Sequence, residues 1–250
     1  MDRLIYTAYS GMTGSTVRQR VIASNMANAQ TIGFRAEMLA ATPMTLKGPS
    51  LEARAMTEGE VRGASMAQGT LIATGKPLDV ALTGDTMLSL QAEDGSEVYS
   101  RRGDLAVSAG GVLENGDGRP VIGENGPITV PLGSKVTISP DGGVLVANPE
   151  APDQPPQLVG RIKIASITGC RIEKGLDGLF RVPGQNGQPG ILPQDDEARL
   201  MVGSLEQSNV DPTRVLVEMV EAQRLFDMRT KVVSQAKEVD ESSASLMRIS

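Results

Sequence analysis

The sequence predicts an α+β protein: N- and C-terminal helices packed together as a coiled-coil-like domain, with a hairpin-rich all-β middle domain. Apolar residues recur at helical spacing near both ends of the 250-residue chain, while short β-branched runs alternate with Asn-Gly and Asp-Gly dipeptides between them. The 28 Gly and 15 Pro stay below the level of low-complexity disorder, about 25–30% of a chain. We therefore expect four segments: a helix and turn over 1–39, an extended connector over 40–76, an all-β domain over 77–206 and a helix over 207–250.

The first segment has the pattern of an amphipathic helix from residue 3 to about residue 28. Its stripe, at spacings of three and four, contains the apolar Ile5, Ala8, Met12, Ile22 and Met26, with the polar Ser15 and Gln19 between Met12 and Ile22. Gly11 and Gly14 fall inside this helix, and each costs roughly 1 kcal/mol relative to alanine. We expect such a helix to depend on its neighbours for stability. A turn follows at Gly33 and Phe34.

The middle of the chain changes character twice. Residues 40–76 show neither helical nor strand periodicity, so we expect an extended connector there. The next segment contains turn dipeptides that join strands into hairpins, namely Asp94-Gly95, Asn115-Gly116, Asp117-Gly118, Asn125-Gly126, Asp141-Gly142, Asp177-Gly178 and Asn186-Gly187. The β-branched runs between them include Pro127-Ile128-Thr129-Val130, Lys135-Val136-Thr137-Ile138 and Arg161-Ile162-Lys163-Ile164. Together they predict an all-β domain rich in hairpins.

The last segment predicts a long helix that begins at a capped end. Asp211 is the expected N-cap and Pro212 the first helical residue, and no Gly or Pro follows as far as Ile249. Such a helix is about 55 Å long at 1.5 Å per residue. It carries two apolar stripes one position out of phase: Val215, Met219, Ala222 and Phe226, and then Leu225, Met228, Val232, Val239, Leu246 and Ile249. Two stripes let one helix face more than one partner.

Composition excludes several classes of enzyme. The chain has no histidine, so it cannot build a Ser-His-Asp or Cys-His site, a histidine-ligated zinc site or a histidine pH switch. Its one cysteine, Cys170, cannot form an internal disulfide and has the pattern of a small buried apolar residue. We expect no catalytic residues, no metal site and no cofactor.

Charge and hydropathy limit the partners. The net charge is −6, and no basic stripe or aromatic platform is present, which disfavours nucleic acid. No run approaches the roughly 18 apolar residues of a membrane span. The apolar stretch from Leu4 to Ala8 is too short for the core of a cleaved signal peptide. We expect the protein either to stay in the cytosol or to leave it by a route that needs no such signal.

Carboxylates near the turns leave a catalytic alternative open. Glu114, Asp117, Glu124 and Asp141 could supply a carboxylate pair for glycoside hydrolysis or oxygens for Ca²⁺. Their spacing matches no calcium loop, and Asp before Gly is common at turns because its short side chain bonds to nearby backbone. Turn chemistry is the better explanation.

Asn25 and Asn28 allow two interpretations. They lie three residues apart on one helical face, close to the expected end of the helix. Either they cap that end with solvated amides, or they are buried amides that set the register between packed helices. The sequence does not decide between these interpretations.

Five segments then resemble the bacterial flagellar rod and hook protein family. The first, from Ala23 to Arg35, is similar to the family's N-terminal signature Ala-Asn-Asn-Leu-Ala-Asn followed by Thr-x-Gly-Phe-Lys/Arg. The others, in the family's order, are Pro77–Leu82 with Gly84-Asp85, Tyr99–Asp104, Gly126–Pro131 and Gly203–Pro212. The opening Met1–Ala8 and the chain length resemble the proximal-rod subunit of type F more than the distal-rod subunit of type G or the longer hook protein.

The resemblance implies a structural role. In this family the terminal helices pack with one another and with neighbouring subunits as an inner tube, and the β domain lies outside. Subunits leave through the flagellar type III export apparatus without a cleaved signal peptide. The assembled rod crosses the periplasm in the flagellar basal body and carries motor torque to the hook. The implied partners are further copies of this chain and other rod proteins.

The leading hypothesis is therefore a polymerising subunit of the proximal rod. The alternatives are a distal-rod or hook-type subunit and, from another class, a secreted carbohydrate-binding β protein. The expected assembly interface consists of Ile5, Met12, Ile22, Asn25, Met26, Asn28, Phe34, Met219, Phe226, Val232, Val233, Val239 and Leu246.

Overall fold

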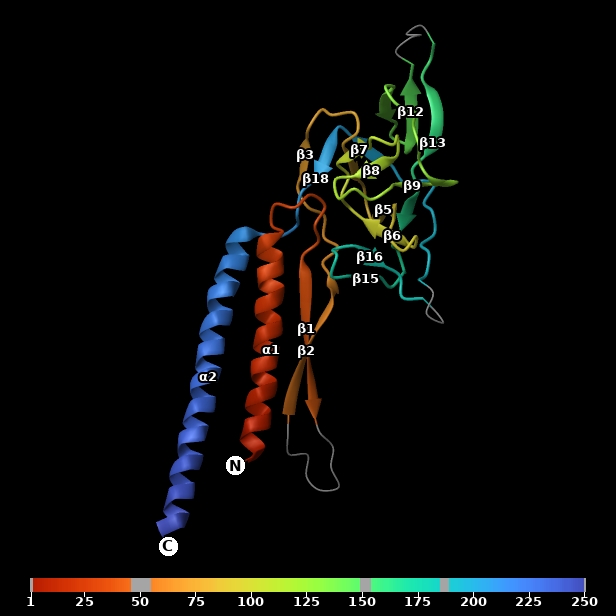
Figure 1. Cartoon of the computed structure of the whole chain (residues 1–250). Helices are drawn as coiled ribbons and strands as arrows, with labels where there is room; N and C mark the ends of the chain where they lie inside the picture. Colours follow the sequence, from red (N-terminus) through yellow and green to blue (C-terminus); the bar gives the residue numbers. More distant parts are fainter. Residues whose placement is uncertain (1, 46–54, 149–153, 185–188, 250) are drawn as a thin grey trace. The chain divides into compact units, whose positions relative to one another are not determined.

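The computed structural model describes residues 2–45, 55–148, 154–184 and 189–249. Helix α1 (Asp2–Ala27) opens the chain and helix α2 (Pro212–Ile249) closes it (Figure 1). The strands between them are β1 (Glu37–Thr45), β2 (Ala55–Ala64), β3 (Leu71–Ala73), β4 (Val80–Leu82), β5 (Thr86–Gln91), β6 (Glu97–Ser100), β7 (Leu105–Val107), β8 (Leu113–Asn115), β9 (Ile122–Gly123), β10 (Gly126–Pro127), β11 (Lys135–Ile138), β12 (Gly143–Ala147), β13 (Gln157–Arg161), β14 (Ile164–Ser166), β15 (Glu173–Lys174), β16 (Phe180–Arg181), β17 (Leu200–Val202) and β18 (Ser204–Glu206). The predicted α+β class, with terminal helices and a strand-rich middle, is confirmed.

The chain divides into two compact units. The helical unit contains Met1–Ala29, Glu37–Gly63 and Val210–Ser250, and the β unit contains Gln30–Ala36 and Ala64–Asn209. The helical unit therefore includes residues from the middle of the chain as well as both ends.

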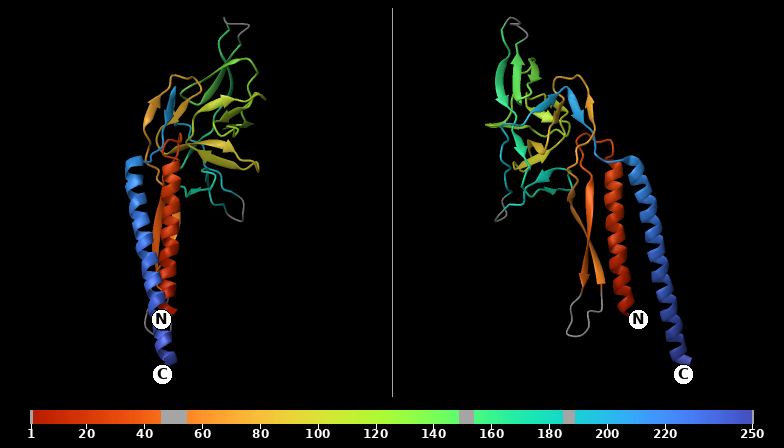
Figure 2. Two further views of the ribbon diagram at one scale, coloured as in Figure 1. Left: turned by 60° about the vertical axis from the view of Figure 1, so that its left-hand side comes forward. Right: turned by 180° about the vertical axis from the view of Figure 1, so that it is seen from behind.

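In the helical unit, α1 lies between α2 and the pair of strands β1 and β2 (Figure 2). The two helices run antiparallel, and α2 is the longer, with 38 residues against 26. The N-cap prediction is confirmed: Asp211 Oδ1 accepts the N–H of Thr213 at 2.9 Å, directly before Pro212 opens the helix.

The pairing of β1 with β2 was not foreseen. We expected residues 40–76 to be an extended connector, but this stretch contains most of β1, all of β2, and β3. Extended backbone was expected, but strand pairing was not, because the stretch lacks the alternation of apolar and polar residues that marks a half-buried strand.

The β unit is built from short antiparallel strands. Its largest sheet has the order β14-β5-β6-β16-β15, and a second has the order β11-β12-β13. Several predicted turn dipeptides join the expected pairs: Asp94-Gly95 links β5 to β6, Asp141-Gly142 links β11 to β12, and Asp177-Gly178 links β15 to β16. The dipeptide Asn186-Gly187 lies outside the described residues.

Two predicted runs have to be corrected. Of the run from Pro127 to Val130, only Pro127 lies in a strand, at the end of β10, and Thr129 forms an isolated bridge with Val112. We expected Arg161 to Ile164 to form one strand, but β13 ends at Arg161 and β14 begins at Ile164. The Ile162 N–H donates to the Gly142 carbonyl at 2.8 Å, and the Lys163 N–H donates to the Ile122 carbonyl at 2.9 Å. At this point the chain passes from the three-stranded sheet to the five-stranded one.

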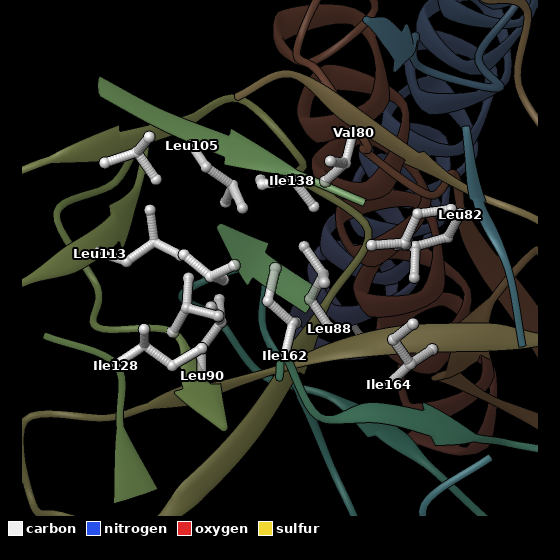
Figure 3. Packing of buried hydrophobic residues seen from close by; sticks show 14 of the residues in the cluster. Val80, Leu82, Leu88, Leu90, Leu105, Leu113, Ile128, Ile138, Ile162 and Ile164 are labelled. Carbon is white, nitrogen blue, oxygen red and sulfur yellow. The ribbon is translucent and has the colours of Figure 1, made fainter. Parts of the chain in front are cut away.

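The core of the β unit is aliphatic. A cluster of buried side chains fills the space between its sheets (Figure 3); among its members are Val80, Leu82, Leu88, Leu90, Leu105, Leu113, Ile128, Ile138, Ile162 and Ile164. Full burial of such a side chain contributes about 1.5–3 kcal/mol to folding. A smaller cluster gathers Met87, Tyr99 and Phe180, and the half-buried Cys170 packs against it.

Candidate assembly interface

One face of α2 is covered within the helical unit. Val215 is 6% exposed and Ala222 is 2% exposed, and Met219, Phe226 and Val233 between and after them are half-buried. These residues are spaced by four, three, four and seven along the helix, so they lie on one face of it. Within the helical unit, α2 packs against α1.

The opposite face of α2 is apolar and exposed. Its large apolar side chains are each about half exposed: Leu216, Val217, Val220, Met228, Val232 and Val239. Single exposed apolar residues are ordinary on a monomer, but a row of them along one helix marks a surface that binds another protein. Of the second stripe seen in the sequence, Met228, Val232 and Val239 lie on the exposed side, Leu225 is half-buried, and the side chains of Leu246 and Ile249 lie outside the described residues.

The predicted interface residues of α1 lie mostly on its covered side. Ile22 is 5% exposed, and Met12 and Met26 are half-buried. Ile5 lies in α1 and Leu246 in α2, but their side chains are outside the described set.

A polar contact interrupts this apolar packing. The Arg229 guanidinium of α2 donates to the carbonyl oxygen of Gly11 and to the hydroxyl of Ser15, which is 2% exposed. A groove of about 390 Å³ runs beside this contact between α1, α2 and β1, and both Gly11 and Gly14 line it. At Gly14 an added Cβ would meet no atom within 4 Å. The two glycines thus keep this side of α1 open.

Asn25 lies in an arrangement that neither earlier interpretation included. Its side chain is buried, Nδ2 donates to the Glu37 carbonyl at 3.1 Å, and Oδ1 accepts the Glu37 N–H at 2.8 Å. Ser24 Oγ also donates to the Glu37 carboxylate at 2.9 Å. Within one chain, Asn25 therefore fastens β1 to α1. Asn28 fits the capping interpretation, because its Nδ2 donates to the Ser24 carbonyl at 2.9 Å near the end of α1.

Phe34 belongs to the β unit. The Lys174 ammonium lies 3.6 Å from the centre of its ring and donates to the Arg35 carbonyl at 2.9 Å. The ring is half-buried, so one chain already supplies part of its surroundings. Its place in an interface between chains stays a prediction.

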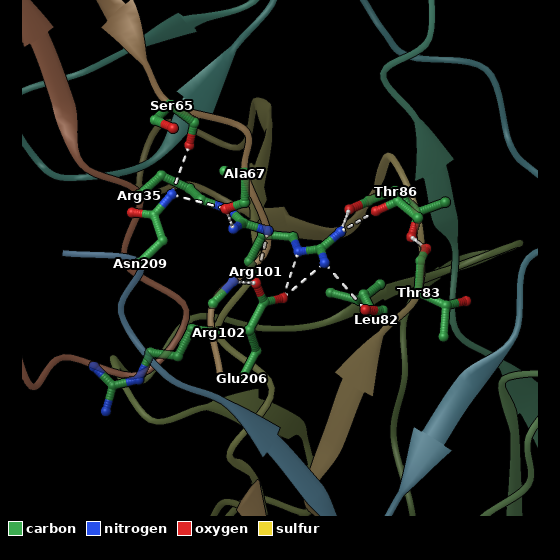
Figure 4. Close-up of polar contacts among 12 residues, drawn as sticks. Arg35, Ser65, Ala67, Leu82, Thr83, Thr86, Arg101, Arg102, Glu206 and Asn209 are labelled. Carbon is green, nitrogen blue, oxygen red and sulfur yellow. Dashed lines mark hydrogen bonds and ion pairs between the residues drawn. The ribbon is translucent and has the colours of Figure 1, made fainter. Parts of the chain in front are cut away.

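The β unit also contains a buried charge cluster that the sequence analysis missed (Figure 4). Glu206 Oε1 accepts Arg35 Nη2 at 2.8 Å, and Glu206 Oε2 accepts Arg101 Nε at 2.9 Å and Arg101 Nη2 at 2.7 Å. The three side chains are only 1–3% exposed. Arg101 donates further to the carbonyls of Leu82 and Thr86, at 3.0 and 2.6 Å.

Burial and the Arg101 charge lower the pKa of Arg35, and Glu206 opposes that shift. The cluster could hardly have been found in the sequence, because its members lie far apart along the chain. The available signal was a charged Glu206 directly after the apolar Leu205 in a strand.

Two of the four turn carboxylates, Asp117 and Asp141, are paired with cations. Asp117 accepts from Arg102, and Asp141 accepts from the Ser139 hydroxyl and from Arg161. The Ser139 hydrogen bond lowers the pKa of Asp141. The general acid of a glycosidase needs a raised pKa, whereas the pKa of Asp141 is lowered.

Three segments of the chain match known protein families. Sequence models match residues 5–35 (Flagella basal body rod protein), 81–146 (Flagellar hook protein FlgE/F/G D1 domain) and 201–246 (Flagellar basal body rod FlgEFG protein C-terminal). The chain is 40% identical over its full length to the complete flagellar basal-body rod protein FlgF of Salmonella typhimurium. This chain belongs to the flagellar basal-body rod protein family.

Other rod proteins are similar over most of their length. FlgF of Escherichia coli is 41% identical over 94% of both chains, and FlgG of Bacillus subtilis is 29% identical over 99% of this chain and all of its own. The identities to these two FlgF proteins are higher than the identity to FlgG of Bacillus subtilis. Within this rod protein, Arg35, Arg101 and Glu206 each fall in a different one of the three matched segments.

Two features are absent from the described residues. Among them, no group of three or more Cys, Asp or Glu side chains is arranged to hold a metal ion. The helices, over the same residues, have no stretch that is apolar and long enough to cross a bilayer.

Proposed function

We propose that this chain is a structural subunit of the proximal flagellar rod and polymerises there through its terminal helices. The observation that carries this proposal is the exposed apolar face of α2, on a helix whose other face is already covered by α1. A surface of one chain that fits a different surface of the next generates a helical filament, which is the form of a rod. The two FlgF identities, 40% and 41%, support the proximal over the distal rod.

The proposal includes the place and the route. The subunit would sit in the basal body beside further copies of itself and other rod proteins, pair its helices in a coiled-coil-like manner, and pass torque to the hook. It would reach that place through the flagellar type III export apparatus without a cleaved signal peptide. The role needs rigid packing between subunits and no catalysis, so we propose that the protein is not an enzyme.

The exposed face can be tested by adding one charge. A bacterium that lacks its own FlgF would be complemented with this chain or with Val232→Asp, and basal bodies would be purified and imaged. Val232 is half exposed, so the substitution should leave the monomer folded, and a buried carboxylate in a subunit interface is costly. We expect export of the variant and no completed rod.

Leu176→Asp is the matched control, because Leu176 is fully exposed on the β unit. It adds the same charge to another exposed apolar site and should allow rod assembly. Normal rods with Val232→Asp would show that this face of α2 is not an assembly surface. If the parent chain itself fails to complement, the assignment to the proximal rod is wrong.

A further inference from the structure

Strand β3 is an open edge of the β unit. Among the described residues it pairs with β18 and with no other strand. The Gln207 N–H donates to the Thr70 carbonyl at 2.8 Å, directly before β3 begins. Only alternate residues of an antiparallel strand bond to the same neighbour, so the backbone groups of Leu71 and Ala73 point away from β18. β3 therefore offers the N–H and C=O groups of these two residues to a further strand.

The side chains of β3 do nothing to block this edge. Leu71 is 36% exposed and Ile72 is 47% exposed, and they lie on opposite faces because successive side chains of a strand alternate. Proteins commonly protect an open edge with charged side chains, proline or a bulge. The edge strand β15 has such protection, since it consists of Glu173 and Lys174. An apolar edge without it is suited to bind another strand.

Strand β13 is a second edge with exposed aliphatic side chains. Within the described part of the chain it pairs with β12 alone, and it lies on a different side of the β unit from β3 (Figure 1). Leu158 is 62% exposed and Val159 is 43% exposed. Val159 is the extra residue of a β-bulge, because Leu158 pairs with Leu145 and Gly160 pairs with Val144. A bulge interrupts regular pairing, so this edge suits a short partner strand such as β3.

We propose that β3 of one chain pairs with β13 of a second copy, so that a sheet continues from one β unit into the next. Neither Leu71–Ala73 nor Gln157–Val159 contains a charged side chain, so the pairing removes no charge from water at these positions. Each strand contributes two large aliphatic side chains that the pairing would help to bury. The backbone groups of the two edges would satisfy one another.

The position of the two edges explains why the partner is a second copy. They are different surfaces of one unit, so their contact is heterologous and repeats from copy to copy, as a filament requires. Pairing of β3 with another β3 would instead close a two-fold dimer and end growth. The choice of a second copy rests on the proposed polymerisation, and it adds to that function a contact that does not involve the terminal helices.

Cysteine crosslinking tests the pairing directly. In a Cys170→Ser chain, Ile72→Cys and Leu158→Cys would be made separately and together, and both positions are exposed. Rods from bacteria that lack their own FlgF and carry each variant would be treated with a short bis-maleimide. Every β3–β13 contact in rods of the double variant contains both cysteines. We expect crosslinked dimers and larger species at least five times more abundant than with either single variant.

A charge on the edge gives a second measurement. Ile72→Lys places an ammonium group on β3, where a strand from another chain would have to cover it. We expect at least fivefold fewer completed rods in imaged basal bodies, while thermal unfolding of the purified chain is unchanged. Leu176→Lys is the matched control, because Leu176 is fully exposed in the turn between β15 and β16. It should leave the number of rods at the parent level.

Three results would overturn the proposal. Crosslinked dimers of the Ile72→Cys single variant would show that β3 pairs with β3. Rods of the double variant without crosslinks would show that the two edges do not meet. A parent number of rods with Ile72→Lys would show that the edge is not covered during assembly.

Failure of the proposed function is a separate outcome. If the parent chain builds no rods, its assignment to the proximal rod fails, and the cysteine variants are then crosslinked as concentrated purified protein. Dimers from the double variant and not from the single variants would support the edge pairing without a rod. Their absence in that experiment would overturn the pairing as well.

Discussion

The side chain of Asn25 forms two hydrogen bonds with the backbone N–H and carbonyl of Glu37. The backbones of neighbouring β-strands pair through the same two bonds. Nδ2 donates to the Glu37 carbonyl at 3.1 Å, and the Glu37 N–H donates to Oδ1 at 2.8 Å. A helix has no free backbone groups along its side, so it can hold a strand edge only through side chains. Asn25 is such a side chain, and it fixes where β1 begins against α1.

Asn25→Leu should therefore loosen β1. The substitution favours the helix, but it removes both hydrogen bonds between the Asn25 side chain and the part-buried backbone of Glu37, at a cost of about 1–3 kcal/mol. Hydrogen exchange at the Glu37 amide should become at least tenfold faster. Asn28→Ala is the comparison, because Asn28 bonds to the Ser24 carbonyl inside α1 and should leave Glu37 unaffected. Equal effects would contradict this assignment.

Phe226→Ala should weaken helix pairing in the single chain. A fully buried Phe costs about 3–5 kcal/mol when truncated to Ala, and about half of that is expected for this half-buried ring. Met228→Ala, on the exposed face, should change the helical signal in thermal unfolding far less. Circular dichroism of both variants at one protein concentration makes the comparison. A larger effect of Met228→Ala would show that the Met228 face of α2, and not the Phe226 face, packs against α1.

Gly33→Ala should destabilise the β unit more than a turn glycine elsewhere. Gly33 has φ of +68°, where an L-residue costs roughly 1–2 kcal/mol, and its added Cβ would also meet the Arg101 backbone. Gly118 has φ of +72° and open space around it. Both variants place a Cβ at positive φ, but only Gly33→Ala adds the clash with the Arg101 backbone. The difference between their free energies of unfolding, measured in urea, is therefore the cost of that clash. Identical shifts would mean that the close approach contributes nothing.

Tyr99 should make the β unit sensitive to alkaline pH. Burial raises the pKa of its hydroxyl well above the ordinary 10.0. The folded state holds this proton more tightly than the unfolded state, so the stabilisation is complete below pH 10 and is lost as the pH rises above it. The loss is about 1.4 kcal/mol per pH unit for one group.

Urea unfolding at pH 9, 10 and 11 measures this loss. Tyr99→Phe should flatten the dependence, while its stability at pH 9 falls because the Leu192 N–H loses its hydrogen bond to the Tyr99 oxygen. An unchanged slope in Tyr99→Phe would assign the alkaline loss to other groups.

Features that depend on neighbours in the chain were predictable from the sequence. The helix start at Asp211 and Pro212 needs only the cap and the residues after it. The hairpin at Asp141-Gly142 follows from the backbone freedom of two residues, and the apolar stripes follow from the helix period. The family motifs are also local, which is why the rod protein family could be inferred from the chain alone.

The tertiary structure decided everything that depends on a distant partner. Two stripes on α2 are equally apolar, so only packing against α1 shows that Val215 and Ala222 lie on the covered face while Val232 is exposed. The amide of Asn25 could serve a cap, another helix or a strand, and the fold supplies the backbone of Glu37. Glu206 is one acidic residue among 30 Asp and Glu in the sequence. Its burial is possible because the fold brings two arginines within 3 Å of its carboxylate. Without these arginines, desolvation of the buried charge would strongly destabilise the fold.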